Sequence, residues 1–347
     1  MRGLAAFLVL IDHVRGDMFV PYGELAVSQR GLATVLFFGV TRLGQEAVIA
    51  FFVLSGFLVG GQVISRARNG SFDIGTYAID RATRIYIPLV PACILAVVID
   101  RLFYNRSPDV IQVLGNMVGL NEVLVSSLAI DPVLWSLAYE IWFYVLAGAV
   151  GYIVTRGPNI ATLLVLTVCV LVFSILKMEY LLFWLLGAGA SVLISIRFKT
   201  ALLVIGICLA VVGTVSYELA ADSKSLVPVA YMPPVAAEFL VSLGIAMTLP
   251  FLASARVNQS LFGIRSFAAA VSGFSYTLYL FHRPIDTALD TIIARSDNIS
   301  LVSLSLYLLR LAICLMGAVI FYYCWERHTA AARRYFSVVI TRRTVPT

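Results

Sequence analysis

The sequence predicts an all-α integral membrane protein, a polytopic bundle of about ten transmembrane helices. Two observations lead to this prediction. Of the 347 residues, 61% are apolar and 13% are charged, with a mean hydropathy of +0.94, whereas soluble domains are about 45–50% apolar and about 25% charged. The apolar residues also form separate runs of about the 20 residues that cross a bilayer core. The composition therefore excludes a soluble globule, a disordered chain and a disulfide scaffold.

Ten apolar windows mark the expected spans. In chain order they cover residues 3–20, 44–64, 82–100, 134–153, 159–176, 180–196, 200–217, 236–253, 270–289 and 304–324. The first begins as a signal peptide does, but charged residues interrupt it and no cleavage pattern follows, so we expect a retained span. No internal repeat or linker divides the sequence. We expect one membrane domain over residues 1–347, including a short basic cytoplasmic tail at 325–347, and no appended extracytoplasmic domain.

The distribution of Lys and Arg predicts the orientation. When the N-terminus is placed in the cytoplasm, most of the 25 basic residues fall on the inner side. They are Arg2, Arg66, Arg68, Arg81, Arg84, Arg156, Arg197, Lys199, Arg256, Arg265, Arg327, Arg333, Arg334, Arg342 and Arg343. The positive-inside rule therefore places both termini in the cytoplasm. The net charge of +6 then reflects topology and contact with anionic lipid, and we expect no nucleic-acid partner.

The five cysteines each lie within an apolar run, and none belongs to a CxxC or Cys/His pattern. We interpret Cys93, Cys169, Cys208, Cys314 and Cys324 as small buried hydrophobic residues. We therefore expect no disulfide and no metal site.

Ionisable side chains inside the expected spans are the strongest functional signal, because each costs about 2.5–3.5 kcal/mol near the bilayer centre. They are Asp12, His13 and Arg15 in the first span, Glu46 in the second, Glu140 in the fourth, and His282 and Arg283 in the ninth. Arg2 and His13 share one helix face about 16 Å apart. If the headgroup of an anionic cofactor lies near Arg2, the reactive end of that cofactor would reach His13. Alternatively, Arg2 is only a topology anchor and His13 is a packed, hydrogen-bonded histidine.

Two further patterns lie in and after the second span. Gly56 and Gly60 allow either another helix or an extended ligand to approach the backbone closely. Arg81 and Arg84, at i and i+3, would hold phosphates on one helix face or serve as a stop-transfer anchor.

In the fourth span, Ser136 and Glu140 lie one turn apart on the same face. In the ninth, a polar stripe at helical spacing predicts a water-accessible cavity, for catalysis or for transport. The stripe consists of Ser272, Tyr276, Tyr279, Arg283, Asp286 and Asp290, with His282 at its border.

These segments together resemble the membrane-bound acyltransferase family 3, which O-acylates cell-surface glycans. The resemblance rests on five motifs in order, at Arg2–Ala6 with His13–Val14, Phe51–Leu58, Arg81–Pro88, Trp135–Tyr144 and Ser275–Pro284. The family's ten-helix core agrees with the expected number of spans. One departure is that the acidic residue common before the Phe-Phe pair falls at Ile49, so Glu46, one turn earlier, is the candidate replacement.

The resemblance implies transfer of an acyl group, most simply acetyl, from cytoplasmic acyl-CoA to a hydroxyl of a lipid-linked or cell-surface glycan at the bacterial inner membrane. The implied catalytic residues are His13 as general base, Glu140 and Arg2. The implied donor-binding residues are Arg81, Arg84, Ser55, Gly56 and Gly60. The implied acceptor-binding residues are Trp135, Tyr139, Tyr276, Tyr279 and His282. A covalent acyl-His13 relay, a transporter or flippase that uses the same cavity, and a structural subunit without chemistry are the alternatives.

Overall fold

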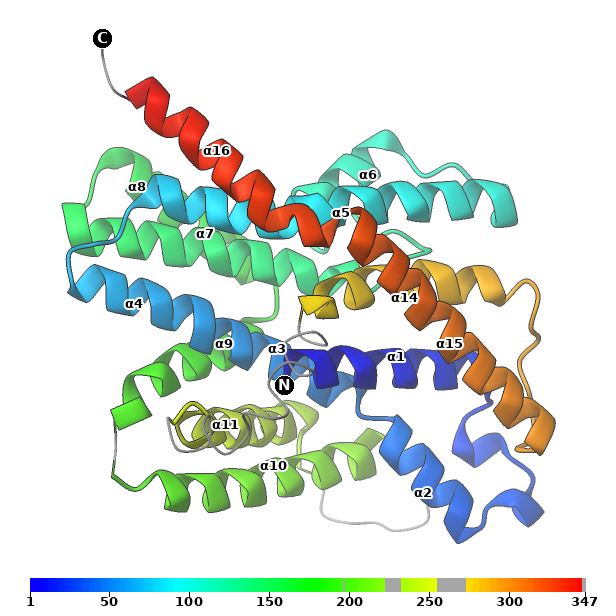
Figure 1. The fold of residues 1–347 in the computed structure, drawn as a ribbon. Helices are drawn as coiled ribbons and strands as arrows, with labels where there is room; N and C mark the ends of the chain where they lie inside the picture. The colour runs from blue at the N-terminus through cyan, green and yellow to red at the C-terminus, as the bar shows by residue number, and fades with distance from the viewer. Residues whose placement is uncertain (196, 222–231, 255–272, 345–347) are drawn as a thin grey trace. The chain divides into compact units, whose positions relative to one another are not determined.

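The computed structural model describes residues 1–195, 197–221, 232–254 and 273–344 (Figure 1). These residues form helices and connecting turns, with no β-strand among them. Arg256, Arg265 and Ser272, which entered the predictions of orientation and of the polar stripe, lie outside the described residues. The all-helical class predicted from the sequence is confirmed for the part of the chain that the structure describes.

The helices follow one another along the chain. They are α1 (Arg2–Met18), α2 (Leu32–Thr41), α3 (Gly44–Ser55), the π-helical segment η3 (Gly56–Gly60), α4 (Gly61–Arg68), α5 (Ile74–Tyr104), α6 (Val110–Met117), α7 (Leu134–Arg156), α8 (Ile160–Ile175), α9 (Met178–Val192), α10 (Lys199–Ala221), α11 (Pro234–Leu252), α14 (Ser275–Leu289), α15 (Leu301–Cys324) and α16 (Thr329–Thr344). Short 3₁₀ turns lie at Tyr22–Glu24, Val27–Gln29, Leu193–Ser195 and, as η6, at Glu326–His328.

Six of these helical stretches are long and apolar enough to cross a membrane. They are Leu32–Arg68, Ile74–Tyr104, Leu134–Arg156, Lys199–Glu218, Pro234–Leu252 and Leu301–Val338. Two shorter apolar helices, α8 and α9, correspond to the fifth and sixth expected spans. Helix α1 has 17 residues and α14 has 15, both short for a span, although each forms where the sequence predicted one. A multi-pass membrane protein is supported, while the number ten and the cytoplasmic termini stay predictions.

The chain forms two compact units, each built from three separate segments. The first unit contains Met1–Gly61, Met178–Ser275 and Leu289–Ala312; the second contains Gln62–Lys177, Tyr276–Ala288 and Ile313–Thr347. The segments of the two units alternate along the chain, and the single membrane domain stays a prediction. Neither part is continuous in sequence, so each depends on packing between segments that are far apart along the chain.

In the first unit, small residues let helices pack closely. Helices α10 and α11 lie side by side (Figure 1), and a methyl group added at Gly206 would meet the carbonyl oxygen of Gly244 at 2.6 Å. Helix α1 packs against α3, where Gly44 faces the side chain of Asp12. Such close backbone contacts replace the hydrophobic effect as the source of helix association inside a bilayer.

In the second unit, capping residues define the helix starts. Asp73 accepts a 2.7 Å hydrogen bond from the Thr76 N–H and so begins α5, and Asn159 and Thr162 form a reciprocal capping box at α8. Hydrogen bonding to the Asp73 carboxylate favours its charged form and lowers its pKa. The stacked rings of Phe143 and Phe173, 5.7 Å apart, join α7 to α8.

Some structure was not predicted. Helices α2 and α6 lie in stretches that the sequence marked as connections, and α16 lies in the expected tail. All three helices are shorter than the window of about 19 residues that detects a span, and α16 is also too polar to be detected as one. The prediction that every cysteine is buried was wrong for Cys208 and Cys324, which are exposed on α10 and α15. An apolar run does not distinguish a lipid-facing position from a core position.

Candidate functional site

The two arginines of α5 share a helix face but differ in their partners. The Arg81 guanidinium lies over the rings of Tyr77 and Tyr144, at 5.9 and 5.4 Å from their centroids. No hydrogen bond or ion pair joins Arg81 to another described residue. The Arg84 guanidinium, in contrast, pairs with the Glu326 carboxylate at 2.5 Å. Glu326 therefore holds one side of the Arg84 guanidinium, while Arg81 has no anionic partner among the described residues.

Glu140 on α7 lies near these arginines. Its carboxylate accepts a hydrogen bond from the hydroxyl of Tyr144, one turn further along the helix. The same tyrosine ring lies under Arg81. Arg81 and Glu140 thus both contact Tyr144 in the second unit. The structure brings together three of the sequence-predicted site residues, Arg81, Arg84 and Glu140.

Tyr276 and Tyr279 on α14 belong to the same unit. The Arg84 guanidinium lies 5.3 Å from the centre of the Tyr276 ring, and the Tyr276 hydroxyl is buried without a hydrogen-bond partner in the described structure. The Tyr279 hydroxyl lies 2.7 Å from the Ser136 hydroxyl and 3.3 Å from the carbonyl oxygen of Val133. Tyr276 of the predicted polar stripe therefore faces α5, and Tyr279 faces the start of α7. Asp290, at the far end of the stripe, pairs instead with Arg310 of α15 at 2.6 Å.

Three other predicted acceptor residues are packed inside the second unit. Tyr139 is 3% exposed, and its hydroxyl accepts the N–H of Lys177 at 2.9 Å. The Trp135 ring meets the Tyr139 ring edge-on at 5.8 Å. His282 is fully buried, with Nδ1 2.9 Å from the Leu278 carbonyl oxygen. These residues support the helix faces that carry Glu140 and Tyr279, and their role in acceptor binding stays a prediction.

Two acidic residues that the sequence did not single out are prominent in the structure. Glu326 holds Arg84. Asp131, just before α7, is fully buried, and neither carboxylate oxygen has a hydrogen-bond partner in the described structure. Burial raises the pKa of Asp131 well above its usual range, against a smaller opposing effect of Arg283. Asp131 precedes an apolar span and Glu326 follows one. Acidic residues are common in such connections, so the sequence gave no signal that these two are buried.

The first unit carries Arg2 and His13 on α1, both half-buried. Asp12 and Arg15 form a 2.6 Å ion pair on that helix. Glu46 on α3 is 8% exposed, and its carboxylate oxygens have no hydrogen-bond partner among the described residues. It lines an apolar groove of about 350 Å³ between α1, α3, α10 and α11. The candidate base and the candidate replacement carboxylate thus lie on neighbouring helices of one unit.

The predicted ligand path beside Gly56 and Gly60 is filled by helix α9. A methyl group at Gly56 would fall 1.8 Å from the Trp184 carbonyl oxygen, and one at Gly60 would meet Ala188 at 2.7 Å. Ser55 accepts a 3.3 Å hydrogen bond from the Trp184 indole N–H. The sequence left open whether a helix or an extended ligand approaches this glycine pair, and in the structure it is helix α9 that does so.

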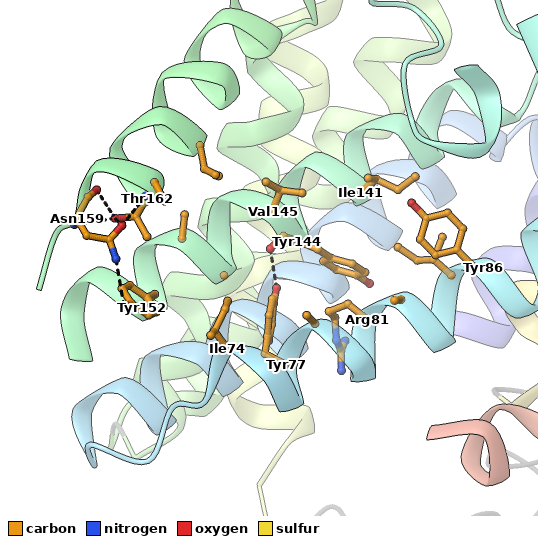
Figure 2. A pocket seen from close by; sticks show the side chains of 17 residues that line it. Ile74, Tyr77, Arg81, Tyr86, Ile141, Tyr144, Val145, Tyr152, Asn159 and Thr162 are labelled. Carbon is orange, nitrogen blue, oxygen red and sulfur yellow. Dashed lines mark hydrogen bonds between the residues drawn. The ribbon is translucent and has the colours of Figure 1, made fainter. Parts of the chain in front are cut away.

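An open groove of about 500 Å³ runs over α5, α7 and α8 (Figure 2). Asn159, Tyr152 and Thr162 gather at one end, and Ile141 and Tyr86 lie at the other. Across its floor the Tyr77 hydroxyl donates to the Tyr144 carbonyl oxygen at 2.9 Å. Apart from Arg81 its wall is nearly all uncharged and apolar, which suits alkyl chains.

Comparison with protein families gave one finding. The model of the acyltransferase domain Acyl_transf_3 matches residues 1–325, which include every sequence-predicted site residue. Comparison with curated proteins and with solved structures gave no significant match. No group of three or more His, Cys, Asp or Glu that would hold a metal ion occurs in the described ranges. Because the match covers nearly the whole chain and the apolar helices are those of a multi-pass protein, the chain belongs to acyltransferase family 3 and is a membrane acyltransferase.

Proposed function

We propose that the protein is an O-acyltransferase that moves an acyl group, acetyl in the simplest case, from cytoplasmic acyl-CoA to a hydroxyl of a lipid-linked or cell-surface glycan. We place it in the bacterial inner membrane with both termini in the cytoplasm. The observation that carries this proposal is Arg81, a cation without an anionic partner among the described residues, beside Arg84 and Glu140 in a chain of the acyltransferase family.

The donor side is assigned to the basic residues. Guanidinium groups hold phosphate through parallel N–H donors, and aromatic faces keep them oriented. Arg81 and Arg84 are the proposed ligands for the CoA phosphates, with Arg2 at the start of α1 as a third. For Ser55, Gly56 and Gly60 donor binding stays a prediction of the resemblance, and their contacts in the structure are with α9.

His13 is the proposed general base. A sugar hydroxyl is a poor nucleophile near neutral pH, and imidazole has the side-chain pKa best placed to accept its proton. As His13 takes the proton, the hydroxyl oxygen forms a bond to the thioester carbonyl carbon and the carbon–sulfur bond breaks. CoA leaves as a thiolate and takes the proton from His13 as a thiol. Glu140 would orient the acceptor, with Tyr276 and Tyr279 on the acceptor side.

Turnover of acetyl-CoA by the purified protein in detergent, measured as release of free thiol in the presence of an acceptor glycan, tests this function. We expect His13→Ala to lower kcat by about 10²–10⁴, the usual contribution of a positioned base, while its elution profile stays that of the wild type. His328→Ala, which removes the exposed histidine after α15, is the matched control and should keep full activity. Wild-type turnover in His13→Ala would remove the base assignment, and a wild-type protein without turnover would favour the transporter.

A further inference from the structure

Glu326 is a buried carboxylate in the turn η6, between α15 and α16. Glu326 is 4% exposed. The sequence around it, Trp-Glu-Arg-His, is typical of the polar end of a span. The region that matches the acyltransferase family ends one position before it. Nothing in the family assignment therefore gives Glu326 a role.

Both oxygens of Glu326 are occupied. One accepts from the Arg84 guanidinium at 2.5 Å. The other accepts from the backbone N–H of Thr277 at 2.9 Å and from the Thr277 hydroxyl at 2.5 Å. Thr277 lies in the first turn of α14, where backbone N–H groups have no partner within the helix and a negative charge is favoured. One carboxylate thus caps α14 and neutralises an arginine of α5.

The same contacts fix the Arg84 guanidinium while leaving part of it available. Glu326 holds Nη1, and the Tyr276 ring lies against the guanidinium plane. No hydrogen bond joins Nε or Nη2 to another described residue, and the Arg84 side chain is 29% exposed. Since a guanidinium presents its donors in a rigid planar fork, fixing one edge and one face determines where the remaining donors point.

We infer that Glu326 is a positioning residue for the acyl donor: it holds Arg84 so that the free edge of the guanidinium meets the donor phosphates, and it keeps the start of α14 beside that site. This inference rests on the proposed function. Glu326 is not a displaceable anion that blocks the site, because both oxygens are engaged and removing one partner of a buried ion pair is strongly unfavourable.

The decisive variants differ in charge but little in shape. Glu326→Gln keeps an oxygen for Thr277 and loses the charge that holds Arg84. Asp80→Asn is the matched control, because Asp80 also joins α5 to the C-terminal segment, through Arg333 at 3.7 Å, without touching Arg84. Two quantities are measured on the purified full-length protein: the KM and kcat for acetyl-CoA, and the Kd for CoA alone by calorimetry.

We expect Glu326→Gln to raise KM and Kd about tenfold, a change typical of losing one charge-assisted contact. Its kcat should stay within about twofold, since a change confined to KM reports lost ground-state binding. Asp80→Asn should change none of these quantities. Glu326→Asp keeps the charge on a shorter side chain, and its KM and Kd should lie between those of the wild type and those of Glu326→Gln. If the glutamine variant does not fold, the KM and Kd of Glu326→Asp test the inference.

Other outcomes overturn the inference. Unchanged or tighter CoA binding in Glu326→Gln would mean that the carboxylate is neutral for the donor or competes with it. Equal losses in Glu326→Gln and Asp80→Asn would mean that both act only by attaching the C-terminal segment. In either case wild-type turnover leaves the proposed function intact, whereas a wild-type protein that neither binds CoA nor turns over acetyl-CoA overturns both.

Discussion

Two arginines one turn apart on α5 show how far a motif alone can be interpreted. The spacing of Arg81 and Arg84 predicts a shared helix face, which the structure bears out. It does not predict that Glu326, more than 200 positions away, pairs with Arg84, or that the rings of Tyr77 and Tyr144 lie beside Arg81. Long-range ion pairs depend on which helices become neighbours, and that information is not contained in local periodicity.

Asp131 is the residue for which the structure predicts a pH-dependent stability. Burial raises its pKa in the folded state, while in the unfolded chain it titrates near the ordinary value of about 3.9. Its contribution to stability is therefore complete below about pH 4 and is lost as the pH rises toward the raised value, because the unfolded state releases the proton first.

We expect Asp131→Asn to melt with the wild type near pH 4 and to gain in relative stability toward pH 7, since an amide has no proton to lose. The melting temperature in detergent at several pH values between 4 and 7 measures this difference. Asp297→Asn, at an exposed carboxyl in another connection, is the control and should melt with the wild type. A constant offset between Asp131→Asn and the wild type would argue against the buried, protonated carboxyl.

At the scale of elements, composition predicts helices better than it predicts their ends or their partners. Helix α5 begins at Ile74, eight residues before the expected span, because the Asp73 cap sets the start whereas hydropathy marks only the apolar part. The spacing of Gly56 and Gly60 indicates a close approach. Only the structure shows that α9 is the helix that approaches Gly56 and Gly60. The sequence does not identify it, because many spans carry small residues.

The contact between α3 and α9 gives a paired prediction within one helix. A methyl group at Gly187 would fall 1.9 Å from the Val53 carbonyl oxygen, whereas one at Gly189 would meet nothing within 4 Å. We expect Gly187→Ala to destabilise the protein by about 1–3 kcal/mol through overpacking. Gly189→Ala should be neutral or stabilising by up to about 1 kcal/mol, since alanine favours the helix. Chemical denaturation in detergent measures both, and equal effects would exclude the tight α3–α9 contact.

At the scale of the whole molecule, the sequence predicted the class and the family, and the structure added how the parts are divided. The predicted site residues of α5, α7 and α14, from Arg81 to His282, belong to one compact unit, and Arg2, His13 and Glu46 belong to the other. A sequence motif gives order along the chain but not membership of a unit, because each unit collects segments more than 100 residues apart.

The orientation in the membrane is the last prediction, and it decides where the donor can enter. Acyl-CoA is a cytoplasmic substrate in the proposal, so the basic residues of α5 and the start of α1 must lie at the inner face. The excess of Lys and Arg on one side of the expected spans predicts this arrangement. It also places the long connection between α5 and α7, which carries Asp131, on the outer side.

Reporter fusions in a bacterial host measure the orientation. Green fluorescent protein matures in the cytoplasm and alkaline phosphatase outside it, so a fusion after residue 347 should be fluorescent and lack phosphatase activity. A fusion truncated at Asn105, the left-handed residue that ends α5, should give the opposite result. If both fusions report the cytoplasm, α5 does not cross the membrane as an odd-numbered span, and if both report the outside, the C-terminus is not cytoplasmic. If both results are reversed, Arg81 and Arg84 face away from the CoA pool, and the acyl-CoA mechanism fails for a reason independent of any side chain.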